Sequence, residues 1–552
     1  MSGGPVVNSG RAIADLRELD RRTGGTDGAQ RLCWGDGWRE ARALLGELLG
    51  EIGLTAEPDP AGNLWASLEG EQEPALALGS HLDSVPEGGW LDGALGVMAA
   101  LGVLRAWSEA GVPPPRTLML VDWADEEGAR FGRSLFGSSA FSGALDPAEV
   151  RGLRDREGGM LVDVLAQNGV DLDRAPEAAS RQERLAAYLE LHIEQGPVLE
   201  AEGLRAAAVS GCAGVERHRF HFSGQASHAG TTPMDRRRDA GLAAAEYALR
   251  VEEIGRRHGG VATTGALALR PGIPTAVAGE AELLIDLRHP QAEELASMLA
   301  EALAAAEAVA AKRGCEHASE PVWRIEPIPF DSRLIAAARE ACREAAGSDR
   351  VLTSGALHDA AEVARVLPAA MVFCPSTSGI SHAKQEDTPE PDLATGIEAF
   401  GLLANRVLSD PPTGMRAHGL HAERVEQLHE RREVRVLGRP PNDRAAAPLE
   451  LEVRARGHAQ VREQGEQVLD PHQPQPGEDR PAPRGQLLER GAKPVQLGRV
   501  KPQPRGVAAA VPLIQLHGTV LKHGEALVDG RRTTEDAVAD EDAGSTSAFV
   551  FR

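Results

Sequence analysis

Residues 75–83 read ALALGSHLD, and this stretch sets the fold class. Ala75–Gly79 is a short apolar run suited to a parallel strand that is buried on both faces. A second such run, Arg116–Asp122 (RTLMLVD), comes after Gly93–Ala110, which is rich in Ala, Leu, Met and Val and favours a helix. Strand, helix and strand in this order predict an α/β domain built on a doubly wound mixed sheet.

The same alternation extends over residues 1–211 and 326–410, which we expect to form one catalytic domain in two parts. Further strands are expected at Leu185–Leu191 and Ala369–Cys374. The expected helices are Trp38–Gly53, Arg333–Ala345, His358–Val366 and Leu393–Leu408.

In residues 212–325 the predicted strands and helices no longer alternate regularly. This pattern predicts an inserted α+β domain with its own sheet, a lid or dimerisation module. Its expected strands are Arg217–Ser223, Thr263–Arg270, Ala281–Arg288 and Cys315–Ile325. Its expected helices are Asp239–Arg257 and Gln291–Arg313.

Composition limits the classes of function. A chain of 552 residues exceeds one hydrophobic core, and a formal net charge of −23 argues against nucleic acid as a partner. No apolar window approaches the length of a membrane span, and the N-terminus lacks the pattern of a secretory signal. The five cysteines form no CxxC pair, which favours reduced thiols in a cytoplasmic protein.

Residues 411–552 differ from the rest of the chain. They carry 21 basic and 20 acidic residues and 14 of the 36 prolines, so the acidity belongs to the first 410 residues. Stretches such as Asp470–Arg484 bury too little apolar surface to offset ordering entropy, which predicts a disordered, low-order C-terminal tail. Within it, Glu423–Val436 is compatible with a solvated helix and Val507–Val528 has weak strand character. The composition also resembles out-of-frame reading of GC-rich DNA, a hypothesis that resequencing around codon 410 would test.

Residues with metal-binding chemistry follow the predicted strands. His81 ends the first strand, and Asp83, two residues on, is placed to hold the imidazole tautomer. Taken alone, this pair is more often structural, and adjacent acids such as Glu126 and Glu127 are usually a solvated charge pair. Several such residues at one sheet edge favour a joint site instead: His81, Asp92, Glu126, Glu127, His192 and His382.

Histidines and carboxylates together suit Zn²⁺, Mn²⁺ or Co²⁺ better than Mg²⁺, Ca²⁺ or an iron–sulfur cluster. Two metal ions that share a bridging carboxylate need about this number of ligands. The pattern therefore indicates a hydrolytic site with two divalent metal ions per subunit.

Six motifs in order resemble the dinuclear metallohydrolases of the metallopeptidase/aminoacylase superfamily. They are GSHLDSVPEGGWLDGALGV (79–97), DEEGARFGRSLFGSSAFSG (125–143), ELHIEQGPVLE (190–200), SGQASHAGTTPMDRRRDA (223–240), SGALHDA (354–360) and GISHAKQE (379–386). LHIEQGP and HAGTTPM are similar to the amidase/carbamoylase branch: N-carbamoyl-L-amino-acid hydrolases, allantoate amidohydrolases and β-ureidopropionases. The resemblance covers about residues 10–408 and leaves the tail without a counterpart.

The resemblance implies a division of roles. His81 and His192 would hold one metal, Glu127 and His382 the other, and Asp92 would bridge them, with Glu126 as general base. His228 would stabilise the oxyanion, reaching the site from a neighbouring subunit of a homodimer. The implied substrate-binding residues are Arg288 as the carboxylate clamp and, more weakly, Gln195, Arg217 and His358.

Two departures from the family pattern bear on the substrate. Thr275, in PGIPTAVAG (271–279), stands where the family usually has an asparagine, and Leu357 stands where a glycine is usual. Neither change removes a metal ligand, so the chemistry is expected to persist while the substrate is open to change.

The sequence thus predicts a metal-dependent hydrolase of linear amides that bear a carboxylate. The leading substrate is an N-carbamoyl-L-amino acid, with allantoate or a β-ureido acid as alternatives. An aminoacylase or peptidase is less favoured, because His192 stands where many peptidase relatives place a carboxylate. A protein of another class, which keeps the metals and binds a ligand with little turnover, is the remaining alternative.

Overall fold

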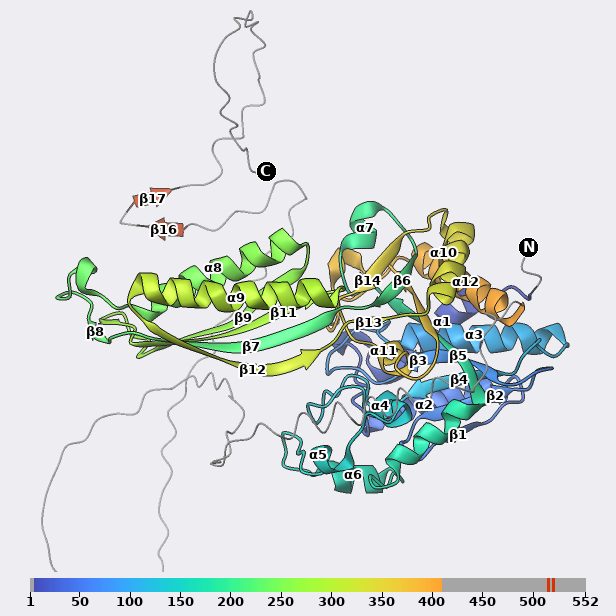
Figure 1. The fold of residues 1–552 in the computed structure, drawn as a ribbon. Coiled ribbons are helices and arrows are strands. Elements are labelled where there is room, and N and C mark those ends of the chain that lie inside the picture. The colour runs from blue at the N-terminus through green and yellow to red at the C-terminus, as the bar shows by residue number, and fades with distance from the viewer. Residues whose placement is uncertain (1–3, 410–513, 517–518, 522–552) are drawn as a thin grey trace, which may run out of the picture. The chain divides into compact units, whose positions relative to one another are not determined.

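The computed structural model describes residues 4–409 and two short strands at 514–516 and 519–521 (Figure 1). Across these residues, no helix has both the length and the apolar character needed to cross a membrane. Residues 4–409 form an α/β body with a nine-stranded main sheet and a separate four-stranded sheet.

The main sheet has the order β1-β2-β4-β3-β5-β15-β6-β13, and β14 pairs with β6. Its central pairs β4–β3, β3–β5 and β5–β15 are parallel, whereas β1–β2, β2–β4, β15–β6 and β6–β13 are antiparallel. The mixed sheet predicted from the sequence is therefore confirmed. The strands are β1 (Ala56–Pro58), β2 (Leu64–Leu68), β3 (Ala75–His81), β4 (Leu118–Trp123), β5 (Leu185–Ile193), β6 (Ala207–Cys212), β13 (Ile328–Pro329), β14 (Val351–Ser354) and β15 (Ala369–Cys374).

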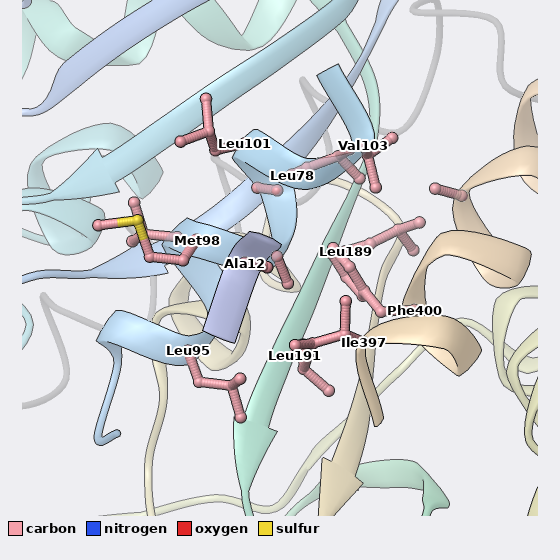
Figure 2. Close-up of a cluster of buried hydrophobic side chains, with 14 of the residues drawn as sticks. Ala12, Leu78, Leu95, Met98, Leu101, Val103, Leu189, Leu191, Ile397 and Phe400 are labelled. Carbon is pink, nitrogen blue, oxygen red and sulfur yellow. The ribbon is translucent and has the colours of Figure 1, made fainter. Parts of the chain in front are cut away.

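Helices cover both faces of this sheet, because the central strands are apolar on both sides. In β15, Ala370 and Val372 pack with the cluster of α1, α3, α10 and α12, whereas Met371 and Phe373 pack with the opposite cluster. Figure 2 shows the first cluster, in which Leu189 and Leu191 of β5 contact Ile397 and Phe400 of α12. This two-sided burial explains the continuous apolar runs.

Helix positions follow the predictions closely in most cases. The predicted helix 358–366 is shorter in the structure, and the first helix, Ser9–Thr23, was not predicted. The helices of the body are α1 (Ser9–Thr23), α2 (Asp36–Gly50), α3 (Ala94–Ala110), α4 (Phe136–Ser142), α5 (Pro147–Val150), α6 (Leu161–Gln167), α7 (Val198–Glu202), α10 (Ser332–Ala346), α11 (Asp359–Val363) and α12 (Glu390–Ser409), with 3₁₀ turns at Gly25–Asp27, Ala175–Arg184, Met234–Arg236 and Thr377–Gly379.

The inserted segment forms an antiparallel sheet of order β12-β7-β11-β9. Apolar residues alternate along β11, so that Leu283, Ile285 and Leu287 pack under two helices and the other face stays partly open. These elements are β7 (Gly214–Ser223), β9 (Val261–Arg270), β11 (Glu280–His289), β12 (Glu316–Ile325), α8 (Ala240–His258) and α9 (Ala292–Arg313), with a small separate pair of β8 (Ser227–His228) and β10 (Ala276–Val277).

The chain enters and leaves the inserted segment through neighbouring strands, since Cys212 of β6 pairs with Ile328 of β13. This pairing supports an insertion at 212–325, although the exact domain boundaries, 1–211, 212–325, 326–410 and 411–552, stay a prediction. The predicted disorder of the tail and the helix at Glu423–Val436 lie outside the described residues. Within the predicted weak strand Val507–Val528, β16 (Ile514–Leu516) and β17 (Thr519–Leu521) form an antiparallel pair.

Candidate metal centre

Strand ends bring the candidate ligands together. His81 is the last residue of β3, and His192 lies near the end of the parallel neighbour β5. Asp92 lies in the loop from β3 to α3, just before the helix begins. The next residue, Gly93, has a φ of +64°, and a Cβ there would overlap the His81 ring. Glycine is therefore required for this close approach.

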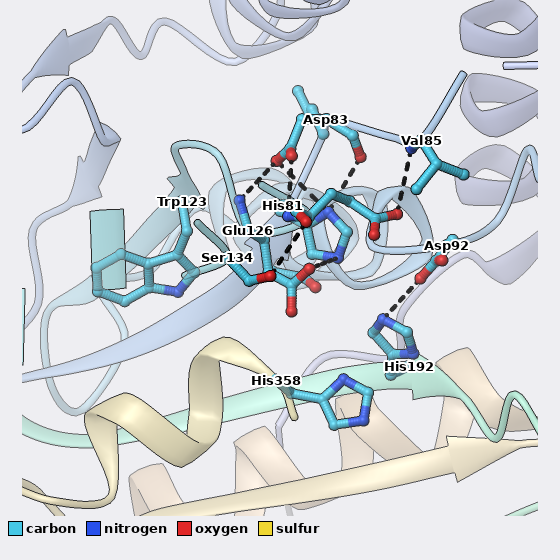
Figure 3. A network of polar contacts seen from close by, with 12 residues as sticks. His81, Asp83, Val85, Asp92, Trp123, Glu126, Ser134, His192 and His358 are labelled. Carbon is cyan, nitrogen blue, oxygen red and sulfur yellow. Dashed lines mark hydrogen bonds and ion pairs between the residues drawn. The ribbon is translucent and has the colours of Figure 1, made fainter. Parts of the chain in front are cut away.

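Asp92 links two groups of ligand atoms. Its Oδ1 lies 3.1 Å from Nε2 of His192, and its Oδ2 lies 3.2 Å from Nε2 of His382 (the first contact is drawn in Figure 3). Together with His81, the first contact makes one buried group of potential ligands, all within 4.8 Å of one another. Together with Glu127, the second contact makes another such group.

Glu127 completes the second group from the loop after β4. Its Oε2 lies 3.6 Å from Nε2 of His382, and its Oε1 accepts a hydrogen bond of 3.3 Å from the backbone N–H of Val85. His382 is 50% exposed and has a φ of +55°, so this group opens toward solvent, unlike the first.

Glu126 lies beside the first group without belonging to either. Its Oε2 is 3.7 Å from Nε2 of His81, and the residue is 8% exposed. The carboxylate of Asp83 accepts the backbone N–H groups of both Glu126 and Glu127, at 3.2 and 3.1 Å. The closest atom to Nδ1 of His81 is the Asp83 carbonyl oxygen at 3.1 Å, rather than the Asp83 carboxylate at 3.6 Å. The backbone carbonyl oxygen of Asp83, and not its carboxylate as expected, therefore holds the His81 tautomer.

The electrostatics of this cluster follow from many buried charges of one sign. Burial, then repulsion from Asp359 and Glu127, raises the pKa of Glu126 well above its usual range. Burial, then repulsion from Asp92, raises the pKa of Glu127 to about 8. For Asp92 itself, burial opposes ionisation, but hydrogen bonds from His192 and His382 outweigh it and hold its pKa well below the usual range.

The pKa values of the three histidines also shift in opposite directions. Burial lowers the pKa of His81 to about 4, which favours the neutral imidazole that coordinates metals. Burial also acts against charge on His192, but its contacts with Asp92 and Glu190 raise its pKa to about 9. The hydrogen bond to Asp92 raises the pKa of His382 to about 9.

These residues fit divalent metal ions. Each group offers nitrogen and oxygen donors, and cations would relieve the repulsion that raises the carboxyl pKa values. A third group, Glu190, His192 and His358, shares His192 with the first. The oxygens of Glu190 already accept hydrogen bonds from Ser80 Oγ and the Ala360 N–H. Glu190 therefore stabilises the protein around His192 and is not free to bind a metal ion.

Two arginines of the inserted sheet share one carboxylate, and one of them contacts the main domain. Arg217 on β7 and Arg288 on β11 both donate to the carboxylate of Asp286, at 2.7 Å for the closest atoms of each. Arg288 also donates from Nη1 to the carbonyl oxygen of Gly355, at 2.5 Å. Gly355 lies three residues before His358, whose ring is 4.4 Å from that of His192. The predicted clamp is therefore linked to the metal cluster through one short loop.

The other predicted residues divide into near and distant sets. Gln195 joins the cluster, because its Nε2 donates 3.1 Å hydrogen bonds to Asp92 Oδ2 and Ser381 Oγ. His228 lies on β8, which Figure 1 shows at the end of the inserted domain away from β3 and β5. Thr275 lies beside it, since its carbonyl oxygen accepts the N–H of Ala229. Within one chain, His228 and Thr275 are not brought to the cluster.

The family comparison agrees with this geometry. The model of peptidase family M20/M25/M40 matches residues 77–406, more than half of the chain. The chain belongs to this family. The N-carbamoyl-L-amino acid amidohydrolase of Geobacillus stearothermophilus is 38% identical over 391 residues, 70% of this chain and 95% of that protein. The allantoate amidohydrolase of Escherichia coli (strain K12) is 34% identical over 380 residues, 68% of this chain and 92% of that protein.

Solved structures give the same picture. A hydantoinase/carbamoylase family amidase from Burkholderia ambifaria has a TM-score of 0.67 and 36% identity, covering 72% of this chain and 98% of that one. The resemblance seen in the motifs is thereby confirmed, and the chain is an enzyme, an amidohydrolase of the M20 family.

Sequence reasoning missed several residues that this M20 site uses. Glu386 accepts the backbone N–H of Asp92, and the fully buried Arg31 donates from Nε to the carbonyl oxygen of Leu82. Asp359, also fully buried, is the strongest charged neighbour acting on Glu126. Asp359 and Glu386 lie inside the motifs that carried the resemblance, but no spacing rule assigns a role to either of them.

Proposed function

We propose that this amidohydrolase cleaves the ureido C–N bond of N-carbamoyl-L-amino acids, which gives the free amino acid, CO₂ and ammonia. The observation that carries the proposal is the buried carboxylate of Glu126, which lies beside two ligand groups joined by Asp92 and belongs to neither. That arrangement leaves one carboxylate available for proton transfer.

In this proposal His81 and His192 hold one divalent metal ion, Glu127 and His382 hold a second, and Asp92 bridges them. Bound there, Zn²⁺, Mn²⁺ or Co²⁺ would supply an acidified water and polarise the substrate carbonyl. Glu126 takes the proton that the attacking water loses and returns it to the leaving nitrogen. Burial raises its pKa, which makes this carboxylate a stronger base than an exposed one.

Arg288 would bind the substrate carboxylate, with Gln195 and His358 along the pocket. Asp286 orients both Arg288 and Arg217, and a planar guanidinium fits a carboxylate through two parallel hydrogen bonds. The overall acidity of the chain makes this local positive charge necessary for an anionic substrate.

Allantoate is the second candidate, because it also presents a ureido group beside a carboxylate. The Escherichia coli relative that carries that name, 34% identical, supports it. A β-ureido acid stands as a further variant of the same chemistry.

The test is an ammonia-release assay on the metal-loaded full chain. The panel contains N-carbamoyl-L-amino acids, allantoate and a β-ureido acid, which release ammonia on cleavage. It also contains N-acetyl-amino acids, which release no ammonia, so their cleavage is followed through the free amino acid. We expect N-carbamoyl-L-amino acids to give the highest kcat/KM. Preference for allantoate would replace the substrate, and silence on the whole panel with full metal content would favour a metal-retaining binding protein.

A homodimer is part of the proposal, because an oxyanion role for His228 requires a second copy. Strand β9 supports it: among the described strands β9 pairs with β11 alone, and Leu267 and Leu269 on it are exposed. Both edge strands carry a bulge, but the opposite edge strand, β12, also carries Pro321, whereas β9 carries no proline. Light scattering of the wild type and of Leu269→Lys is expected to give a dimer and a monomer.

We also propose a cytoplasmic location. All five cysteines are free thiols, and four of them are buried. Reduced thiols are typical of a reducing compartment.

A further inference from the structure

Glu386 joins the two loops that carry ligands of the second group. Its Oε1 accepts hydrogen bonds from the backbone N–H groups of Leu91 and Asp92, at 3.1 and 3.0 Å. Its Oε2 accepts a 2.8 Å hydrogen bond from Oγ of Ser381, the residue before His382. One buried carboxylate thus connects the two positions that must converge on one metal ion, although they are far apart in the sequence.

The surroundings are built to admit this carboxylate. A Cβ at residue 89 would overlap the Glu386 side chain, so Gly89 leaves the space for it. A second contact lies alongside, because Nε1 of Trp90 donates to Oδ1 of Asp387 at 3.2 Å. Among the acidic groups, Glu386 has the strongest electrostatic interaction with the fully buried guanidinium of Arg31. The positive charge of Arg31 compensates the buried negative charge of Glu386.

The two ligand groups depend on this connection to different degrees. His81 and His192 lie on β3 and β5, where parallel ladders with β4 and β15 fix their backbones. His382 lies in a loop, is half-exposed and has a positive φ, so the sheet does not hold it. The 3.2 Å separation of His382 Nε2 and Asp92 Oδ2 therefore relies on side-chain contacts such as those of Glu386.

We propose that Glu386 is a positioning residue that holds Asp92 and His382 in register and so sets the metal affinity of the Asp92–Glu127–His382 group. The inference rests on the metal assignment made under the proposed function. It predicts an asymmetric effect: loss of Glu386 weakens the position with His382 more than the position with His81 and His192, because Asp92 belongs to both groups and His382 to only one. A general loss of structure would weaken both equally.

The experiment measures metal binding without substrate. The full chain, stripped with a chelator, is titrated with Zn²⁺ in competition with a chromophoric chelator, as wild type and as Glu386→Ala. We expect two bound equivalents in the wild type. In Glu386→Ala we expect one equivalent to weaken by about 10–100-fold, the usual range for outer contacts of metal ligands, and the other to weaken clearly less.

The matched control is Asp239→Ala. Asp239 also accepts two backbone N–H groups, those of Gly241 and Leu242, but it caps α8 in the inserted domain. Its removal should leave both zinc affinities unchanged. If Glu386→Ala does not fold, Glu386→Gln serves instead, because it keeps the side-chain volume and one acceptor oxygen; a weakening of about tenfold or less at one position is then expected.

Zinc titrations of the Glu386 variant that match the wild type, or that weaken at both positions equally, would overturn the positioning role. Asp92→Asn separates this outcome from failure of the metal assignment. If Asp92→Asn still binds two equivalents with wild-type affinity, the ligand assignment itself is wrong, whatever Glu386 does.

Discussion

Replacing Glu126 by glutamine separates proton transfer from metal binding. The substitution keeps the shape of the side chain and leaves the backbone N–H of residue 126 bonded to Asp83. It removes a carboxylate that belongs to neither ligand group and that is repelled by Asp359 and Glu127. We therefore expect metal content to stay at the wild-type level and the melting temperature to stay equal or rise.

The expected loss lies in turnover. A positioned general base contributes about 10²- to 10⁴-fold to a hydrolytic rate. At about 1.4 kcal/mol for each factor of ten, the barrier should rise by about 3–5 kcal/mol. The KM should change little, because the proposed carboxylate clamp, Arg288, is on a different sheet.

The assay compares three proteins: wild type, Glu126→Gln and the neighbouring Glu127→Gln. Metal is counted by elemental analysis after gel filtration, and kcat by ammonia release. Glu127→Gln should lose metal, because Glu127 belongs to the Asp92–His382 group. If Glu126→Gln loses metal while Glu127→Gln retains it, the two roles must be exchanged. If Glu126→Gln keeps both its metal and its rate, the general-base assignment is refuted.

Three further perturbations test other parts of the site. Arg288→Lys loses the planar fork and should raise KM by about 10–100-fold, the worth of a charged hydrogen bond, with kcat less affected. Arg219→Lys, on the neighbouring strand β7 and paired with Glu320, should leave steady-state kinetics unchanged. Gly93→Ala should displace the His81 imidazole, a proposed metal ligand, and lower zinc stoichiometry. Gly111→Ala, also at positive φ but with open space around it, should cost stability in a thermal melt without losing zinc. In metal-free protein the pKa of Glu127 is raised from an ordinary 4.5 to about 8, so between these values the folded state binds a proton that the unfolded state has released. The free energy of unfolding, measured with urea, should therefore fall from pH 5 to pH 8. A rise over that range would contradict the repulsion assigned to Glu127.

The fold was predictable where burial is simple. The apolar runs that become β3, β4 and β15 are buried on both faces, so their composition alone indicates central strands. The helix Ser9–Thr23 was missed because its apolar residues form only one stripe, on a segment rich in arginine and acidic residues. The strand Ala207–Cys212 is as long as β15, but Ser210 and Gly211 interrupt its apolar run, so its sequence stands out less.

The site was predictable for the residues at strand ends. His81 and His192 follow apolar runs, and parallel strands bring their carboxyl ends together. Glu386 was not predictable in this way, because its partners Leu91 and Asp92 are nearly 300 positions away. The carboxylate of Asp83 was predicted to contact the His81 imidazole, but it accepts the backbone N–H groups of Glu126 and Glu127 instead. The carbonyl oxygen of Asp83 is the group that contacts the imidazole.

Arg288, the proposed carboxylate clamp, already donates several hydrogen bonds within the protein. Three of the five guanidinium N–H groups are in use, with Asp286 and the carbonyl oxygen of Gly355 as acceptors. At most two remain for a substrate carboxylate, so a bidentate clamp needs both, or needs the bond to Gly355 to break. Because Gly355 belongs to the main domain and Arg288 to the inserted sheet, breaking that bond changes a contact between the two. If the proposed clamp uses the N–H that holds Gly355, binding of the substrate carboxylate would change this contact between the inserted sheet and the main domain. A substrate without a carboxylate would then leave the contact unchanged.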